Sequence, residues 1–284
     1  LESIFEAPER PTHQYLKDFG FSDNIIQHFF QPFFGGVCLD PKIAASNRVF
    51  EYVFKMFAQG DAAIPEAGMA EIPRQIAADL PEECIGKRMR VAALRPDGVV
   101  IDDGRKLTAA RIVLATAAGE VLRLLGIEET VSYLSEYCLY FVAPKPVFPN
   151  RLLVLNGAGD GPINNLAFLS QVSGKYASNG QLLMAAVVIG AHDEDEDQLE
   201  RGVKGQFREW FGQEADSWRH LKTYHIQKAL PDQRPPAPNP YRFNPWIGSN
   251  LYVCGEYGSL PGIQWALYSG RQAAESILSK SHGT

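Results

Sequence analysis

Residues 251–278 read LYVCGEYGSLPGIQWALYSGRQAAESIL, and this stretch near the C-terminus decides the fold. It starts with a short apolar run typical of a buried strand and breaks at Gly255-Glu256. A loop with glycine and proline follows, and from Ile263 onward apolar and small residues recur at helical spacing. We therefore expect a strand, an acidic turn, a glycine-containing loop and a helix, in that order.

This order of elements predicts a ligand site at the end of the strand. The amides in the first turn of a helix have no partner within the helix, and the helix dipole makes that end positive. Glycine lets a ligand come close to the backbone, and the carboxylate of Glu256 can accept hydrogen bonds from hydroxyl groups. The ligand would present an anionic or carbonyl-rich face. The structural alternative is an ordinary strand-to-helix crossover with a glycine turn.

The wording of the stretch resembles the C-terminal flavin segment of the FAD-dependent amine oxidase and phytoene desaturase superfamily. In that family the strand ends as LYxxGD, and the loop and helix read GSLxGAxxSGRxAAExIL. Here Ser269-Gly270-Arg271 matches, whereas Glu256 replaces Asp and Gln264-Trp265 replaces small residues. The resemblance implies that the acid binds the ribityl or pyrophosphate part of FAD and that the helix points at the pyrimidine end of the flavin. It implies cofactor contacts from Gly255, Glu256, Gly262, Ile263, Gln264 and Ala266.

Composition narrows the function classes. The net charge of −6 over 284 residues argues against an extended nucleic-acid surface. No apolar run approaches the roughly 20 residues of a membrane span, and the N-terminus lacks the features of a signal peptide. The six histidines include no HxxxH pair, so we expect no metal site. Four scattered cysteines without a CxxC pair favour free thiols in a reducing, cytoplasmic compartment.

The first sixty residues predict helices rich in phenylalanine. Residues 12–31 read as two short helices split at Gly20, with Ser22 as the N-cap of the second and Pro32 as its end. Residues 46–58 form a strongly amphipathic pattern with phenylalanines on one side. Such an aromatic stripe is usually core, and the functional alternative is the wall of an apolar substrate tunnel. The PFFGGVCL stretch resembles the PFFxGVxL of desaturase-like members.

Residues 59–116 resemble further parts of the family's FAD domain. The Gly68-Met69 turn and the helix after it are similar to a segment whose turn lies close to the flavin. Strand candidates follow at 84–94, 99–102 and 111–116, with a hairpin signal at 102–105. The last is a continuous apolar run of the kind found inside a sheet covered on both faces. The resemblance makes these strands the β-meander of the FAD domain and places Val91, Ala115 and Thr116 beside the adenosine part.

Residues 127–241 have a different texture. Four β-rich runs with short connections predict a mostly antiparallel sheet. The NGAGDG of residues 156–161 looks like a dinucleotide loop, but Pro162 and another β run follow instead of a helix, so we expect a hairpin loop. The charged run 192–200 predicts a solvated helix start rather than a calcium site. His225 is a weak catalytic candidate, since a lone histidine on a strand is more often packed or exposed.

The GxGxxG unit with which complete members of this family begin does not occur in the sequence. We therefore expect a mixed α/β fold that holds an incomplete FAD-binding domain and an interleaved substrate domain. The substrate domain would comprise residues 1–58 and 127–245, and the remainder of the FAD domain 59–126 and 246–284. Weak or absent FAD binding and self-association to a homo-oligomer follow as expectations for this chain.

The resemblance implies that the chain is the C-terminal part of an FAD-dependent oxidoreductase, inactive alone. The parent enzyme would oxidise a C–N or C–C unit by hydride transfer to the flavin, and its abundant phenylalanine favours an apolar or amine substrate. Two alternatives stay open. One is a flavin-free binding or scaffold protein that keeps the fold, and the other is a flavin-dependent isomerase. The sequence names no catalytic acid or base.

Overall fold

The computed structural model describes residues 1–145, 147, 151–178, 180–190 and 195–281, and it divides into two compact units. Unit 1 comprises residues 1–8, 80–132 and 236–284, and unit 2 comprises residues 9–79 and 133–235. The expected division into a cofactor domain and a substrate domain remains a prediction. Its boundaries differ from those of the units at residues 1–8, 59–79, 127–132 and 236–245, which that division assigned to the opposite parts.

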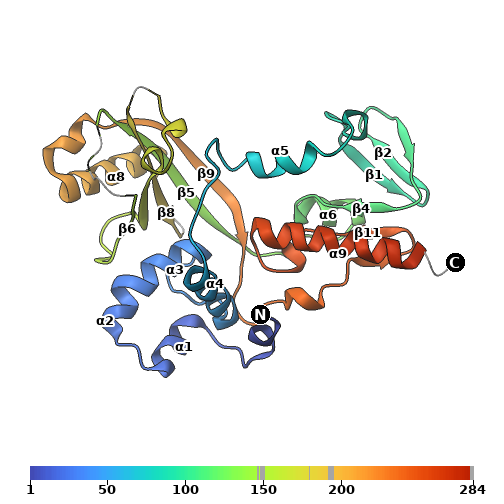
Figure 1. The fold of residues 1–284 in the computed structure, drawn as a ribbon, viewed down its shortest axis with the longest axis horizontal. Coiled ribbons are helices and arrows are strands. Elements are labelled where there is room, and N and C mark those ends of the chain that lie inside the picture. Colours follow the sequence, from blue (N-terminus) through green and yellow to red (C-terminus); the bar gives the residue numbers. More distant parts are fainter. Residues whose placement is uncertain (146, 148–150, 179, 191–194, 282–284) are drawn as a thin grey trace. The chain divides into compact units, whose positions relative to one another are not determined.

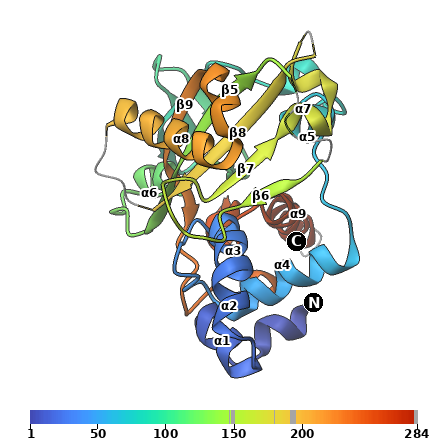
Figure 2. The ribbon, with the colours of Figure 1, turned by 90° about the vertical axis from the view of Figure 1, so that its left-hand side faces the viewer.

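Unit 2 is built on an antiparallel sheet, five-stranded within the described residues, in the order β6-β7-β8-β5-β9 (Figure 2). The strands are β5 (Tyr133–Ala143), β6 (Leu153–Leu155), β7 (Asn165–Phe168), β8 (Leu182–Ile189) and β9 (Arg219–Pro231). The predicted antiparallel sheet is thus confirmed. Residues 156–164 connect β6 to β7 as a hairpin loop, which also confirms the interpretation of NGAGDG.

One face of this sheet is covered by α8 (Glu196–Phe211), as Figure 2 shows. Helix α8 buries Leu199, Val203 and Phe207 against inward-facing residues of β5 such as Leu139 and Phe141. Asp195 caps the helix by accepting the amide of Gln198 over 2.7 Å, as expected for an acidic helix start. The short helix α7 (Leu169–Val172) follows β7, where the sequence predicted a longer strand.

The phenylalanine-rich part of unit 2 is helical (Figure 1). It contains α1 (Thr12–Phe19), α2 (Asp23–Ile25), α3 (Gln31–Cys38) and α4 (Asn47–Gln59), and α5 (Glu71–Ala77) belongs to the same unit. Ser22 caps α2 as predicted, since its hydroxyl accepts the amide of Ile25 over 3.4 Å. The expected stop at Pro32 is wrong. A π-helical turn, Ile26–Phe30, joins α2 to α3, and Pro32 lies in the first turn of α3, where a missing N–H costs little.

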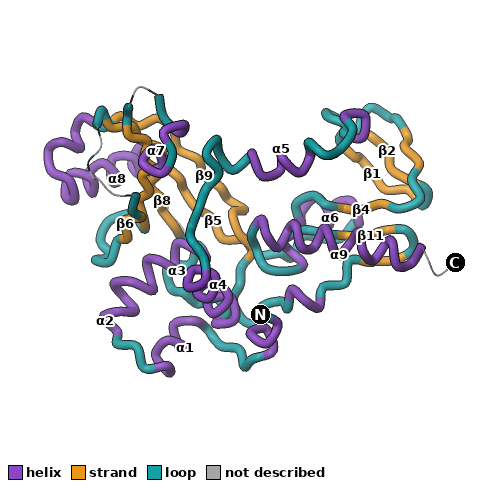
Figure 3. Tube along the Cα trace, in the orientation of Figure 1, coloured by secondary structure: helices purple, strands orange, loops and turns teal. Residues whose placement is uncertain are grey.

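Unit 1 holds two small sheets, each three-stranded within the described residues (Figure 3). The first is a meander of β1 (Val91–Arg95), β2 (Gly98–Ile101) and β3 (Lys106–Thr108). Residues 84–90 precede β1 without being strand, so the predicted strand 84–94 is too long. The hairpin signal at 102–105 is confirmed by the antiparallel pairing of β2 with β3. The sequence did not predict β3, whose residues are all exposed.

The second sheet of unit 1 has the order β10-β11-β4, with β10 (Trp246–Gly248), β11 (Leu251–Val253) and β4 (Ile112–Leu114). Strand β4 pairs in parallel with β11, and its other edge is unpaired in the described chain. Val113 at its centre is 40% exposed, so the sheet is not covered on both faces here as the sequence predicted. Helices α6 (Ala118–Leu125) and α9 (Ile263–Ser281) complete the unit.

The mixed helix-and-sheet architecture confirms the predicted fold class. None of the helices in the described ranges combines the length and apolar character that a membrane crossing requires. Within the same ranges, no three histidine, cysteine or acidic side chains gather closely enough to hold a metal ion.

Candidate functional site

The candidate site of unit 1 lies where its two parallel strands end. Strand β11 pairs with β4 in the register Leu251 to Ile112 and Val253 to Leu114, and the amide of Cys254 donates to the carbonyl of Leu114 over 3.0 Å. The carboxyl ends of both strands therefore meet at one sheet edge. This pairing brings together Gly255-Glu256, which follow β11, and Ala115-Thr116, which follow β4 and are both exposed. The sequence had predicted both pairs as cofactor contacts.

The bend after β11 is fastened to helix α9 by a buried serine. The Gly255 amide donates to the Oγ atom of Ser269 over 2.9 Å, and this hydroxyl donates to the carbonyl of Ala266 over 2.9 Å. Gly255 has φ 152°, a backbone conformation that strongly favours glycine. The resemblance had marked Ser269 as a matching residue without giving it a role, and the structure supplies one.

Glu256 lies at the start of α9 and is half-buried. Its Oε2 atom accepts the amide of Gly262 over 3.2 Å, so the carboxylate lies at the positive end of the helix dipole. Three amides were predicted to meet a ligand. One of them, that of Gly262, therefore already has a hydrogen-bond acceptor within the chain. In the part of the chain that the structure describes, no acceptor faces the amides of Ile263 and Gln264.

Two further features of this loop leave room for a ligand with hydrogen-bonding groups. Ser259 is 3% exposed, and its Oγ atom has no hydrogen-bond partner among the described residues. Such a buried, unpaired hydroxyl is uncommon and needs an explanation. Gly262 has φ 132°, and the space where a Cβ would stand is bordered by the side-chain amide of Gln264 at 2.9 Å. A larger residue at Gly262 would therefore crowd the side chain of Gln264.

The meander is joined to α6 by Arg123, which sequence reasoning missed. The guanidinium of Arg123 donates to the carbonyls of Val91 over 2.9 Å and Ala92 over 3.1 Å. It also pairs with Glu120 one helical turn earlier, and this hydrogen bond lowers the pKa of the Glu120 carboxyl. Val91 was predicted to lie beside the adenosine part, and its backbone carbonyl is engaged by the chain itself. The feature of the sequence that could have drawn attention to Arg123 was its spacing of three residues from Glu120 on a short helix.

The turn that carries Gly68 and Met69 belongs to unit 2. Gly68 has φ 104°, and Met69 is 46% exposed. The preceding Pro65-Glu66 is held by the β7–β8 connection: Tyr176 donates to the Pro65 carbonyl over 2.7 Å, and Lys175 pairs with the Glu66 carboxylate at 2.8 Å. These bonds explain why residues 59–79 belong to unit 2. The flavin contact expected of Gly68 and Met69 stays a prediction.

The outer face of β5 carries a row of titratable groups at Glu136, Cys138 and Tyr140. Burial raises the pKa of Glu136, and it also raises the pKa of Tyr140 to about 12. His225, on neighbouring β9, stacks on Tyr137 with ring centroids 4.0 Å apart. This packing supports the structural interpretation of His225 over a catalytic one.

Comparison with known proteins decides the family. Residues 7–278 match the family described as flavin containing amine oxidoreductase. The chain belongs to this family. No curated protein matches the sequence.

Solved structures share the fold of this family member at low identity. An oxidoreductase from Methanosarcina mazei is 17% identical and superposes with a TM-score of 0.68, covering 98% of this chain and 70% of its own. A putative protoporphyrinogen oxidase from Exiguobacterium sp. 255-15 is 16% identical, with a TM-score of 0.67 and coverage of 95% and 67%. A reduced UDP-galactopyranose mutase is 14% identical, with a TM-score of 0.61 and coverage of 88% and 63%. The chain therefore spans less than two thirds of the mutase.

Proposed function

We propose that this chain supplies the flavin-facing end of the cofactor site in an FAD-dependent oxidoreductase. Support comes from one arrangement, in which two parallel strands end beside a helix whose first amides, at Ile263 and Gln264, are open. Family membership gives the chemistry of the ligand. The unpaired hydroxyl of Ser259 and the glycine at position 262 fit a large, carbonyl-rich group that approaches the backbone.

Each residue of the site would have a distinct role. The amides of Ile263 and Gln264 donate to carbonyl or anionic oxygens of the cofactor, and the free side of the Glu256 carboxylate accepts from a hydroxyl. Ala115 and Thr116 border the same sheet edge from the neighbouring strand. Ala266 has a small side chain and so leaves space for the cofactor beside the helix. The bound FAD would accept a hydride from the substrate, while the protein orients the substrate and excludes water.

We infer that the substrate is an amine or an apolar molecule. The support lies in the phenylalanines of unit 2, of which Phe30, Phe34 and Phe50 form a buried core while others are exposed beside it. Phe29 stacks on Phe33 with centroids 5.7 Å apart, and Phe33 contacts Phe57 at 5.2 Å. Phe29 and Phe57 are 39% and 44% exposed, which is unusual for large aromatic side chains in one patch. The proposed resemblance to desaturase-like members rests on residues 32–39, which include Phe33.

The experiment uses the product of the complete gene. Purified protein should show visible flavin absorbance, and an amine or unsaturated apolar substrate should bleach that absorbance under anaerobic conditions. Absence of bound flavin after reconstitution with FAD would contradict the proposal and support a flavin-free binding or scaffold protein. A bound flavin that must be reduced first and then turns over a substrate without net oxidation would support an isomerase instead, a reaction class represented by the mutase of similar fold.

The role of the strand end can be tested separately. Glu256→Ala should weaken FAD binding about 10- to 150-fold, because a charge-assisted hydrogen bond is worth about 1.5–3 kcal/mol. Glu275→Ala is the matched control, since Glu275 lies on helix α9, whose start Glu256 contacts, and pairs with the exposed Arg271 at 2.7 Å. Quenching of flavin fluorescence measures both affinities. Equal affinities in the two variants would contradict the assignment of Glu256.

A further inference from the structure

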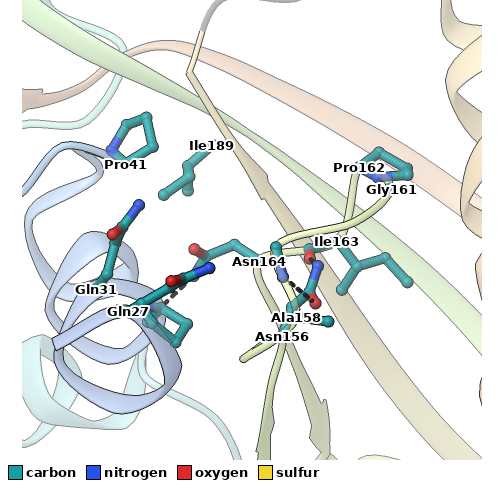
Figure 4. Close-up of a pocket in the computed structure, with 12 residues that line it drawn as sticks. Gln27, Gln31, Pro41, Asn156, Ala158, Gly161, Pro162, Ile163, Asn164 and Ile189 are labelled. Atoms are coloured by element: carbon teal, nitrogen blue, oxygen red, sulfur yellow. Dashed lines mark hydrogen bonds between the residues drawn. The ribbon is translucent and has the colours of Figure 1, made fainter. Parts of the chain in front are cut away.

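Unit 2 carries a continuous groove that none of the predicted cofactor residues lines. It consists of two hollows that share Gln27 and Gln31. The first, of about 370 Å³, lies between the helical turn that carries these glutamines and the 156–164 loop (Figure 4). The second, of about 590 Å³, includes His13, Lys17 and Lys42. Both volumes are in the range of small-molecule sites.

The first hollow is uncharged and has a rigid wall. Asn156 holds the loop by donating to the carbonyls of Asp160 and Ile163, each over 2.7 Å. Asn164 crosses to the opposite helix and donates to the carbonyl of Pro32 over 2.9 Å (Figure 4). The amides of these two asparagines are therefore committed to structure. Ile189, which is 8% exposed, adds an apolar side chain to the lining of this hollow.

The two glutamines are free to bind. Within the described residues, the side-chain amides of Gln27 and Gln31 have no hydrogen-bond partner, and each offers both donors and an acceptor. The π-helical turn Ile26–Phe30 positions them: the amide of Gln31 donates to the carbonyl of Ile26, five residues back. Figure 4 shows both side chains on the groove side of this helix. Single π turns inside α-helices occur frequently at functional sites.

The second hollow is cationic. His13 and Lys17 are four residues apart on α1 and so lie on one face of that helix. Lys17 makes an exposed ion pair with Asp23 at 3.3 Å, whereas Lys42 has no ion-pair partner among the described residues. The Nδ1 atom of His13 is buried and has no hydrogen-bond partner in the same part of the chain. The hollow thus combines two ammonium groups, one of them paired with the Asp23 carboxylate of the same lining, with a ring nitrogen that has no partner among the described residues.

Lys42 is held by a strained turn. Its neighbour Ile43 has φ 43°, and the nearby Leu39 has φ 56°. Positive φ is a genuine outlier for a β-branched residue, and such strain is concentrated at functional sites. The Asp40 carboxylate supports the turn by accepting the amide of Lys42 over 3.0 Å. The turn therefore costs free energy that packing elsewhere must offset. It fixes the backbone position of Lys42.

We propose that this groove binds a phosphorylated sugar or polyol. The phosphate would lie between Lys17, Lys42 and His13, and the hydroxyl-bearing body would meet Gln27 and Gln31. Phosphate suits the cationic end better than carboxylate, because the lining there contains lysines and no arginine among the described residues. Lysine binds a tetrahedral anion as a point charge, whereas the planar carboxylate is best matched by the arginine fork.

The test is calorimetric titration of the full chain with glucose, inorganic phosphate, glucose-6-phosphate and glycerol phosphate. At least one phosphate ester should bind about tenfold more tightly than inorganic phosphate, since it engages both hollows. Binding of both esters should weaken as salt rises, because the cationic end is exposed. If neither ester binds more tightly than inorganic phosphate, the groove holds an adventitious ion only and the proposal is wrong.

Variants separate the two halves of the groove. Lys42→Gln should weaken the ester and inorganic phosphate alike by about tenfold, because it removes a charge-assisted contact. Gln31→Ala should weaken the ester and leave inorganic phosphate unchanged. Lys87→Gln and Gln198→Ala change exposed residues of the same types outside the groove and should affect neither ligand. If Lys42→Gln binds the ester as Lys87→Gln does, the site assignment is overturned. Circular dichroism checks that all four variants are folded.

Discussion

The Oγ atom of Ser269 accepts the amide of Gly255 over 2.9 Å and at the same time donates to the carbonyl of Ala266. Ser269 is fully buried, so both bonds are shielded from water. The end of strand β11 is in this way fastened to the second turn of helix α9. The bend that carries Glu256 and the helix start that carries the open amides consequently behave as one rigid part.

Replacing this serine should loosen that part. Ser269→Ala leaves the Gly255 amide without its acceptor, and we expect a loss of about 1–3 kcal/mol in the free energy of unfolding. Urea denaturation followed by circular dichroism measures it. Ser279→Ala is the matched control, because Ser279 makes the same kind of bond to the carbonyl of Ser276, three residues back on the same helix, but is exposed. Equal losses in the two variants would contradict the locking role.

Arg123 should stabilise the meander of β1, β2 and β3 against local opening. Its guanidinium joins the carbonyls of Val91 and Ala92 to helix α6, so Arg123→Gln should speed hydrogen exchange at the amides of β1 and β2. Arg95→Gln removes an exposed local pair with Asp97 on the same sheet and should leave exchange elsewhere unchanged. Exchange measured by mass spectrometry distinguishes the two. Protection of β1 that survives Arg123→Gln would show that the meander needs no such support.

The sequence predicted the strand, bend and helix at residues 251–278 because local patterns determine them. The apolar run, Gly255 and the spacing after Ile263 each act within a few residues. The antiparallel sheet of unit 2 was equally visible, since β5 and β8 are long and apolar. The residues at which helices and strands begin and end were harder to predict. Helix α3 continues past Pro32 because this proline lies in the first turn of α3, directly after a π turn, and no local pattern in the sequence predicts that geometry.

The site was predictable in part for a similar reason. Glu256 and the helix start lie in one continuous stretch, and the resemblance named them directly. The bond from Arg123 to Val91 joins residues 32 positions apart, and that from Lys175 to Glu66 spans 109 positions. Such pairings depend on the tertiary fold, which a single sequence does not reveal residue by residue. They decide which of the predicted contacts are open and to which unit the Gly68 turn belongs.

Glu136 should make stability depend on pH. Burial raises the pKa of its carboxyl above the usual 4.5, so the folded state holds this proton more tightly than the unfolded chain. The ionised carboxylate therefore destabilises the fold above the folded-state pKa, and this penalty disappears as pH falls below 4.5.

Glu136→Gln should accordingly raise the urea midpoint at neutral pH and leave it unchanged near pH 4. Glu209→Gln, at an exposed position of α8, is the control and should leave the midpoint unchanged at both values. Midpoints measured across this range test the sign. A variant that is less stable than the wild type at neutral pH would show that the carboxylate has a favourable partner.

Gly258 should tolerate no side chain. A Cβ atom at this position would stand 2.1 Å from the Cε2 atom of Phe243, so Gly258→Ala forces the ring to move and should cost about 1–3 kcal/mol. Gly270→Ala is the control, because nothing lies within 4 Å of its Cβ position in helix α9. There alanine should stabilise the helix by up to about 1 kcal/mol.

Combining Gly258→Ala with Phe243→Ala tests the cause of that loss. If the ring is the obstacle, the double variant should lose less stability than the sum of the two single variants, with a coupling of about 0.5–3 kcal/mol. Additive losses would mean that the ring is not the obstacle, because Gly258 has no positive φ that would itself require glycine. In that case the packing of Phe243 would not fix the turn after Glu256, whose carboxylate meets the start of α9.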